Sequence, residues 1–166
     1  MSSEQKTTCV ADGKRALDSA IRALARRDHS EAELRRKLRE KDYSEEIIAE
    51  IVVKLTRLGY LDDRRFARSW AESAIRNGRG YGPRLRLELN RRGVSAEIQQ
   101  EVLAELGETY AEAETLAALQ ARKFPGFSPD CATEKEKRRI ISYLQRRGFS
   151  LGGIFNHLRT INNREE

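Results

Sequence analysis

Three eleven-residue segments of this sequence follow one pattern, and their recurrence constrains the fold more than any other feature. They cover residues 34–44, 85–95 and 140–150, at offsets of 51 and 55 residues. Each begins with Leu or Ile, has Leu four residues later, and ends with a hydrophobic residue followed by serine. A short helical unit that recurs in this way stacks on its neighbours, because one unit alone buries too little apolar surface.

Each segment lies between two further stretches in which apolar residues recur at helical spacing, so each repeat contains three helices. We therefore predict an all-α fold of three tandem three-helix repeats that form an elongated, curved molecule. The predicted boundaries of the repeats are residues 14–61, 62–107 and 108–166. Residues 1–13 are polar and aperiodic, and we expect a disordered N-terminal tail there.

In the first repeat, the pattern predicts a helix over about residues 14–27 and a second helix that begins after Ser30. Ser30 followed by Glu33 is the sequence of a capping box, in which each side chain bonds to the backbone of the other residue. The apolar face expected for the first helix consists of Leu17, Ala20, Ile21, Leu24 and Ala25. The third helix is expected to bury a wide face that runs from Ile47 to Leu58.

The second repeat is the most sharply defined by the sequence. Asp62 stands at an N-cap position, and an apolar face follows it. The residues of that face are Phe66, Ala67, Trp70, Ala74 and Ile75. The helix ends at the turn of residues 77–82, where we expect Gly80 and Gly82 to adopt positive φ angles. Trp70 is predicted to lie in the core.

Basic residues are concentrated in two regions of a chain whose formal net charge is +6. Residues 14–92 hold 21 Lys and Arg against 13 Asp and Glu, and residues 122–166 hold 10 against 5. Residues 93–121 between them contain six acidic residues and no basic one. Arginine outnumbers lysine, which suits bidentate contacts with phosphates or carboxylates. The distribution therefore indicates a polyanion or an acidic protein as partner.

The chain lacks the sequence features of an enzyme, a metal site or a membrane protein. Its two histidines, His29 and His157, are not accompanied by a nucleophile, a ligand cluster or a phosphate-binding loop after a strand. Cys9 and Cys131 are too few for a disulfide framework or a zinc site, so we expect no cofactor and no metal. No long apolar run and no signal-peptide core are present, and we expect a cytoplasmic protein without a membrane partner.

Three blocks of the sequence resemble the signature motifs of the RecX family. They are HSEAELRRKL at residues 29–38, GYLDDRRFA at residues 59–67 and GRGYGPRLRLELNRRGVS at residues 78–95. The resemblance extends over about residues 16–161. It implies a non-enzymatic regulator of the bacterial recombinase RecA that lies in the groove of the RecA filament on DNA. It further implies that the protein blocks ATP hydrolysis and strand exchange and limits filament growth.

Arginines at corresponding places in the three repeats are the candidates for contact with a filament or with DNA. The candidates are Arg35, Arg36, Arg39, Arg76, Arg79, Arg84, Arg86, Arg91, Arg92, Arg138, Arg139, Arg146 and Arg147. The strongest signal among them is the recurrence of Arg-Arg before glycine, at residues 91–93 and 146–148. Tyr60 and Tyr81, near the central turn, could stack on a base, but such tyrosines more often belong to the core.

The expected partners are the RecA filament and single- or double-stranded DNA, bound directly or through the filament, and the chain itself is expected to be a monomer. The alternative is a helical DNA-binding protein with no recombinase partner, since helix-turn-helix domains also consist of three short helices. Such a domain would have one recognition helix richer in Asn, Gln and Arg than the others. No helix in this sequence stands out in that way.

Overall fold

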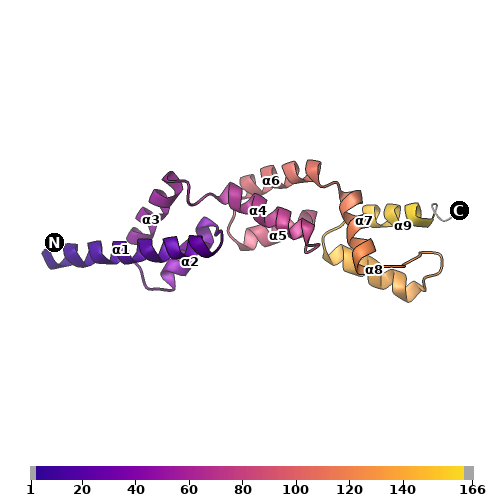
Figure 1. Ribbon diagram of the computed structural model, residues 1–166, viewed down its shortest axis with the longest axis horizontal. Coiled ribbons are helices and arrows are strands. Elements are labelled where there is room, and N and C mark those ends of the chain that lie inside the picture. The colour runs from indigo at the N-terminus through magenta and orange to yellow at the C-terminus, as the bar shows by residue number, and fades with distance from the viewer. Residues whose placement is uncertain (1–2, 163–166) are drawn as a thin grey trace. The chain divides into compact units, whose positions relative to one another are not determined.

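The computed structural model describes residues 3–162, and this part of the chain is all-α, with nine helices and no strand (Figure 1). The helices are α1 (Ser3–Arg26), α2 (Glu31–Arg39), α3 (Glu45–Arg57), α4 (Asp63–Arg76), α5 (Gly82–Arg91), α6 (Ala96–Thr109), α7 (Glu112–Lys123), α8 (Glu134–Arg146) and α9 (Leu151–Asn162). They form three successive groups of three, which confirms the predicted fold class.

The described chain divides into two compact units. The first unit contains the residues up to Ala67 together with Asn90–Ile98, and the second contains Arg68–Leu89 and the residues from Gln99 onward. The division passes through α4, α5 and α6. Each unit therefore combines one terminal repeat with a part of the central one.

The end of each eleven-residue segment has the same local geometry in all three repeats. The serines Ser44, Ser95 and Ser150 each accept a hydrogen bond from the amide three residues later, at 3.4, 3.4 and 3.0 Å. Two residues before each serine the backbone is left-handed, with φ of 62° at Asp42, 75° at Gly93 and 98° at Gly148. A left-handed residue ends one helix and the serine starts the next, so the repeated sequence encodes a repeated helix–turn–helix corner.

The core of the first unit consists of α1, α2 and α3. Its buried residues include Leu34 and Leu38 from α2, and the apolar stripe that begins at Ile47 on α3. The side of α1 that faces them is made of the alanines Ala16, Ala20 and Ala23. These small residues let the helices approach closely, and Leu17 and Leu24 pack along the edges of the contact.

Three residues of the first repeat differ from the predicted faces. The sequence predicts Ile21 and Ala25 on the buried face of α1, yet Ile21 is 49% exposed and Ala25 is exposed as well, because the stripe of Ala16, Ala20 and Ala23 faces the core. Leu58, predicted to continue the buried face of α3, follows the last residue of that helix and is 53% exposed. Helical periodicity finds the helix, but an error of one position in its phase moves such residues from core to surface.

The structure also begins the first helix earlier than predicted. α1 starts at Ser3, whereas the sequence analysis predicts a disordered tail up to Gly13 and a helix from Lys14. This stretch contains one glycine and no proline, so nothing in it stops a helix from extending outward from the packed part. Residues 1–2 of the predicted tail lie outside the described chain.

In the second repeat, α4 buries Phe66, Ala67, Ala74 and Ile75 as predicted, together with Ala71. Trp70 is only half-buried and is not among the core residues, so its prediction as a core anchor is wrong. Small Ala71 takes the adjacent inward position. The turn after α4 has positive φ at Gly78 (63°) and Gly82 (44°) but not at Gly80, which corrects the prediction for that glycine.

The core of the second unit gathers residues of α7, α8 and α9. Leu116 and Leu119 on α7 pack with Ile140 and Leu144 on α8, and Ile154 on α9 completes the cluster. Ile154 follows its capping serine by four residues, as do fully buried Ile48 and buried Gln99 in the other repeats. The three repeats therefore share one core position at the start of their third helix.

We expect Leu38→Ala to lower the free energy of unfolding by about 2–5 kcal/mol, because the substitution leaves a cavity in the centre of the first unit. The matched variant Leu58→Ala removes the same atoms from a half-exposed side chain and should change stability by less than about 0.5 kcal/mol. Urea denaturation followed by circular dichroism measures both. Equal losses for the two variants would contradict the core described here.

Candidate interaction surface

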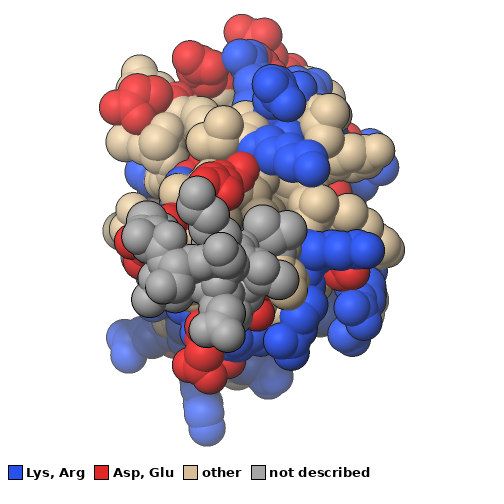
Figure 2. Space-filling view, turned by 90° about the vertical axis from the view of Figure 1, so that its left-hand side faces the viewer, with Lys and Arg blue, Asp and Glu red and all other residues tan. Residues whose placement is uncertain are grey.

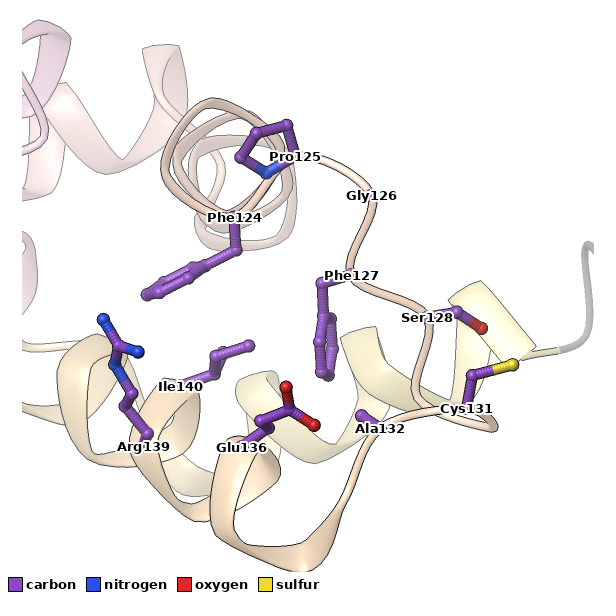
Figure 3. Close-up of a pocket in the computed structure, with 10 residues that line it drawn as sticks. All are labelled: Phe124, Pro125, Gly126, Phe127, Ser128, Cys131, Ala132, Glu136, Arg139 and Ile140. Carbon is purple, nitrogen blue, oxygen red and sulfur yellow. The ribbon is translucent and has the colours of Figure 1, made fainter.

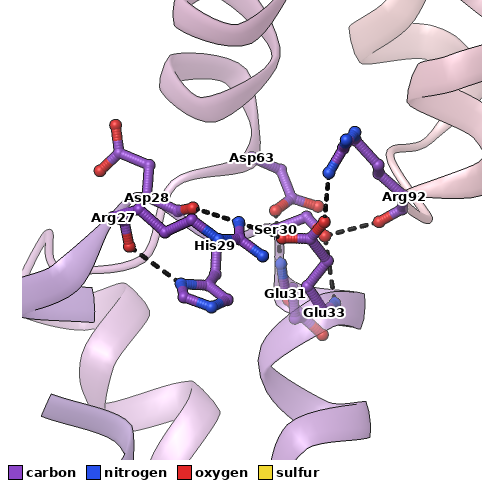
Figure 4. A network of polar contacts seen from close by, with 8 residues as sticks. All are labelled: Arg27, Asp28, His29, Ser30, Glu31, Glu33, Asp63 and Arg92. Carbon is purple, nitrogen blue, oxygen red and sulfur yellow. Dashed lines mark hydrogen bonds and ion pairs between the residues drawn. The ribbon is translucent and has the colours of Figure 1, made fainter. Parts of the chain in front are cut away.

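The thirteen arginines predicted as contact residues divide into those held inside the fold and those that face solvent freely. Arg92 belongs to the first group. Its guanidinium lies 2.6 Å from the carboxylate of Glu33, which is itself only 5% exposed. The other oxygen of Glu33 accepts a hydrogen bond from Arg27 at 2.8 Å. One buried carboxylate thus joins a residue of the first repeat to a residue of the second within the first unit (Figure 4).

This arrangement corrects the predicted capping box. Ser30 does accept a hydrogen bond from the Glu33 amide, at 3.1 Å. The Glu33 carboxylate, however, pairs with Arg27 and Arg92 and not with the backbone of Ser30. Burial opposes ionisation of Glu33, but the two guanidinium groups outweigh it and lower the pKa of Glu33 below its ordinary value. Glu33 is therefore a charged residue at a repeat junction and not only a helix cap.

Three further contacts close the same junction. The Ser30 hydroxyl donates to the carbonyl oxygen of Arg92 at 2.5 Å. The carboxylate of Asp63 accepts from the amide of Glu31 at 2.7 Å, so the start of α4 is bound to the start of α2. Burial raises the pKa of the Asp63 carboxyl. A side chain at Gly93 would collide with Ala32, and only glycine fits this turn.

The second unit contains a junction of the same design, here between the second and third repeats. The carbonyl oxygen of Arg147 accepts from the amide of Tyr81 at 2.7 Å. A side chain at Gly148 would collide with the carbonyl oxygen of Tyr81 and lie 2.8 Å from Cβ of Arg84. The rings of Tyr81 and Phe149 stack with centroids 5.2 Å apart and an interplanar angle of 6°.

The two junctions correspond residue by residue. Ser30 and Tyr81 are 51 residues apart, the offset between the first two repeats, and Arg92 and Arg147 are 55 apart, the offset between the last two. In each unit the turn Arg-Arg-Gly meets the start of the second helix of the preceding repeat. We call residues 91–93 and 146–148 the docking turns, and residues 30–34 and 81–85 the receiving segments.

The repeated Arg-Arg-Gly motif was predicted to mark a binding surface, and in the structure its second arginine serves the junction. Arg147, like Arg92, makes its contacts within the fold. Its guanidinium donates to the carbonyl oxygen of Arg79 at 3.2 Å and lies 5.0 Å from the ring centre of Tyr143. The central turn of residues 77–82 is therefore partly covered by the third repeat. Tyr81 is part of this contact, and its hydroxyl donates to the carbonyl oxygen of Tyr110 at 2.8 Å.

Several other candidate arginines are paired within the fold. Arg35 pairs with Glu31, Arg39 with Glu45, Arg76 with Glu72 and the Tyr110 hydroxyl, Arg84 with Glu88, and Arg79 donates to the Ser73 hydroxyl. Most of these pairs lie at the surface, where an ion pair contributes no more than about 1 kcal/mol and can exchange for a partner's carboxylate or phosphate. Arg91 is exposed and also has a partner within the molecule.

The remaining candidates are exposed and make no hydrogen bond or ion pair with the described part of the chain. They are Arg36 on α2, Arg86 on α5, and Arg138, Arg139 and Arg146 on α8. These three helices are the second helices of their repeats. Figure 2 shows basic side chains interspersed with acidic ones on the face that it presents.

Sequence reasoning missed the roles of Glu33, Asp63 and His29. The sequence indicates helix caps for the first two, and for His29 it shows only the lack of a catalytic partner. His29 is 5% exposed, its Nδ1 lies 2.9 Å from the carbonyl oxygen of Arg27, and burial lowers its pKa. In the first junction a signal was available, because the acidic residues of the receiving segment 30–34 match the basic docking turn 91–93 one repeat later.

Within residues 3–162, no helix is long and apolar enough to cross a membrane. No group of His, Cys, Asp or Glu in the same residues is placed to hold a metal ion. Cys131 is a free, exposed thiol.

Comparison with known proteins gives one consistent result. Residues 16–55, 62–103 and 111–156 match the family models described as the first, second and third three-helix domains of RecX. "Regulatory protein RecX" of Syntrophotalea carbinolica is 34% identical over 142 residues, covering 86% of this chain and 93% of the relative. The protein of the same name from Trichlorobacter lovleyi is 40% identical over 131 residues, covering 79% and 85%.

Solved structures share the fold. The crystal structure of RecX from Lactobacillus salivarius superposes with a TM-score of 0.77 at 21% identity, covering 93% of this chain and 99% of that one. A second crystal structure, of a regulatory protein RecX, gives a TM-score of 0.73 at 20% identity, covering 96% and 78%. The helical architecture is therefore retained at low sequence identity.

We expect Arg92→Ala to lower the free energy of unfolding by about 1–3 kcal/mol, because it removes one of two partners from the buried Glu33 carboxylate. Arg86→Ala is the matched control: this side chain is exposed and unpaired in the described structure, and its loss should cost less than about 0.5 kcal/mol. Chemical denaturation of both variants tests the distinction. A stable Arg92→Ala variant would mean that the junction does not depend on this pair.

We expect the stability of the first unit to fall as the pH is lowered through the ordinary His29 pKa of 6.5. The pKa of folded His29 lies below that of the unfolded chain, so the unfolded state gains the proton first and is favoured as the pH falls. Melting curves between about pH 8 and pH 5 should show this loss, and His29→Gln should flatten it. A profile identical in the wild type and in the variant would assign the pH dependence to other groups.

Proposed function

Because this chain belongs to the RecX family of regulatory proteins, we propose that it is a non-enzymatic regulator of the recombinase RecA in the cytoplasm. It binds in the groove of the RecA–DNA filament and acts as an inhibitor. Its presence there slows ATP hydrolysis and strand exchange and limits filament growth.

One observation supports a filament as the target: exposed arginines, unpaired within residues 3–162, recur on the second helix of every repeat. Arg36 lies on α2, Arg86 on α5, and Arg138, Arg139 and Arg146 lie on α8. A filament repeats its acidic residues and phosphates along its length. A chain that repeats its basic residues can therefore contact several successive filament subunits.

The energetics favour such distributed binding over a single strong site. An exposed pair between an arginine and a carboxylate contributes about 0.2–1 kcal/mol, too little to hold a partner alone. Contacts linked on one chain add because the second and third form at high effective concentration once the first has formed. The junctions contribute by limiting how far adjoining parts of the repeats can move within each unit, which reduces the entropy lost on binding.

The test is RecA-catalysed, single-strand-dependent ATP hydrolysis measured while the protein is titrated in. We expect the triple variant Arg36→Glu, Arg86→Glu, Arg146→Glu to need at least about tenfold more protein for half-maximal inhibition, because three attractive contacts become repulsive. The variant should keep the wild-type melting temperature, since none of these side chains has a hydrogen bond or ion pair in the described structure.

A second triple variant, Lys14→Glu, Arg57→Glu, Arg159→Glu, changes the net charge equally at exposed residues outside the candidate set. It should inhibit nearly as well as the wild type. Equal weakening by both variants would show that overall charge, and not these arginines, governs binding. If the wild-type chain binds single-stranded DNA yet leaves RecA-catalysed hydrolysis unchanged at every concentration, the alternative of a DNA-binding protein without a recombinase partner holds.

A further inference from the structure

Within residues 3–162, the first and third repeats each carry one half of a junction that no other repeat completes. No repeat in this part of the chain precedes the first, so its turn at residues 40–42, which corresponds to the docking turns, meets no receiving segment there. No described repeat follows the third, so its receiving segment meets no docking turn there. Aligning Ile140 with Leu34 and Leu85 places this segment at residues 136–140.

This vacant segment lines an open pocket of about 340 Å³. Glu136, Arg139 and Ile140 form one side of the pocket, and the loop after α7 forms the other (Figure 3). In the figure, the rings of Phe124 and Phe127 point into the space, and Ile140 lies between them and α8. The Arg139 guanidinium borders the pocket and makes no hydrogen bond or ion pair with residues 3–162.

The unused turn of the first repeat has a different character from the two docking turns. It reads Glu40-Lys41-Asp42 where they read Arg-Arg-Gly, and all three residues are exposed. Asp42 keeps the left-handed backbone of the glycines, with φ of 62°. It is the only non-glycine residue with positive φ in the described chain. The turn therefore has the right backbone for docking but carries an acidic side chain where Gly93 and Gly148 carry none.

We propose that the turn of residues 40–42 docks into the pocket of the third repeat of a second copy of this chain, so that molecules associate head to tail. The contact continues the design of the two internal junctions. The turn fits the pocket in size. The internal receiving segments leave no room for a Cβ at Gly93 or Gly148 of the docking turns, whereas the pocket of the third repeat is open and can admit the side chain of Asp42. The turn also fits the pocket in charge, because the turn carries Glu40 and Asp42 and the pocket is bordered by the guanidinium of Arg139.

Lys41 does not oppose this docking, although it corresponds to Arg92 and Arg147. Its ammonium group lies 3.2 Å from the hydroxyl of Ser19 in its own repeat. In the second junction the two corresponding positions are also occupied by cations, Arg84 and Arg147. The junction forms nonetheless, since Arg84 pairs with Glu88 at 2.7 Å and Arg147 lies over the ring of Tyr143. Glu136 is likewise occupied, because its carboxylate accepts from the Thr133 amide at 2.8 Å in a capping box.

A single turn in a single pocket is a small interface, of the class that forms transiently. The free chain is therefore mostly monomeric, as the sequence analysis expects. Copies bound next to each other on a filament would meet at high effective concentration and would bind cooperatively. This last step rests on the proposed function, whereas the docking itself does not. A head-to-tail contact of this kind is heterologous and can extend along an open array.

The test uses two full-length chains mixed without recombinase, so that its failure would leave the proposed function standing. Both carry Cys9→Ser. The first also carries Cys131→Ser and Glu40→Cys, and has its thiol on the turn. The second keeps Cys131 beside the pocket. Under mild oxidation at high protein concentration we expect the mixed disulfide to form at least about fivefold faster than with Glu50→Cys, an exposed control on α3.

Two substitutions of charge then test the fit. Arg139→Gln in the second chain, or Asp42→Asn in the first, should bring the rate of mixed disulfide formation down to that of the Glu50→Cys control. Arg146→Gln, on the same helix but outside the pocket, should leave the rate unchanged. Equal rates for Glu40→Cys and Glu50→Cys, or equal effects of Arg139→Gln and Arg146→Gln, would overturn the proposal.

Discussion

The first unit depends on a buried carboxylate held between two guanidinium groups. Glu33 is almost fully excluded from water, and a charge in such a place is stable only when it is paired and hydrogen-bonded. One of its partners, Arg27, comes from the first repeat and the other, Arg92, from the second. The folding of the first repeat is thereby coupled to the presence of the second, which is how a three-helix unit too small to be stable alone gains its stability.

The arginines of this protein therefore have two roles, since some hold the junctions between repeats and others are exposed. Each Arg-Arg doublet contains one residue of each kind. In Arg91-Arg92 and Arg146-Arg147, the second residue turns toward the preceding repeat and the first is exposed. The glycine that follows each doublet allows the turn to approach backbone or Cβ atoms of its neighbour. The first repeat, which no other repeat precedes within residues 3–162, reads Glu-Lys-Asp at the same place. The motif thus occurs where there is a junction to form.

The sequence was sufficient to predict the fold class, the capping serines and the central leucines of the second helices, because each depends on local spacing and local hydrogen bonding. It placed Ile21 and Trp70 wrongly, since both errors concern which side of a correctly predicted helix meets the core. The junctions were not predicted either. Glu33 and Arg92 are 59 residues apart, and pattern analysis within one repeat does not show that such residues meet.

The proposed roles of the adjacent residues Arg146 and Arg147 are opposite, Arg146 in contact with the filament and Arg147 in the junction between repeats. Binding to the RecA filament tests these roles most directly. The measurement is the affinity of Arg146→Gln and Arg147→Gln for RecA filaments on single-stranded DNA, taken well below the melting temperature of both variants. The account predicts that Arg146→Gln weakens binding and melts like the wild type, whereas Arg147→Gln melts earlier and binds nearly as well while folded. Weaker binding by Arg147→Gln with an unchanged melting temperature, and normal binding by Arg146→Gln, would contradict it.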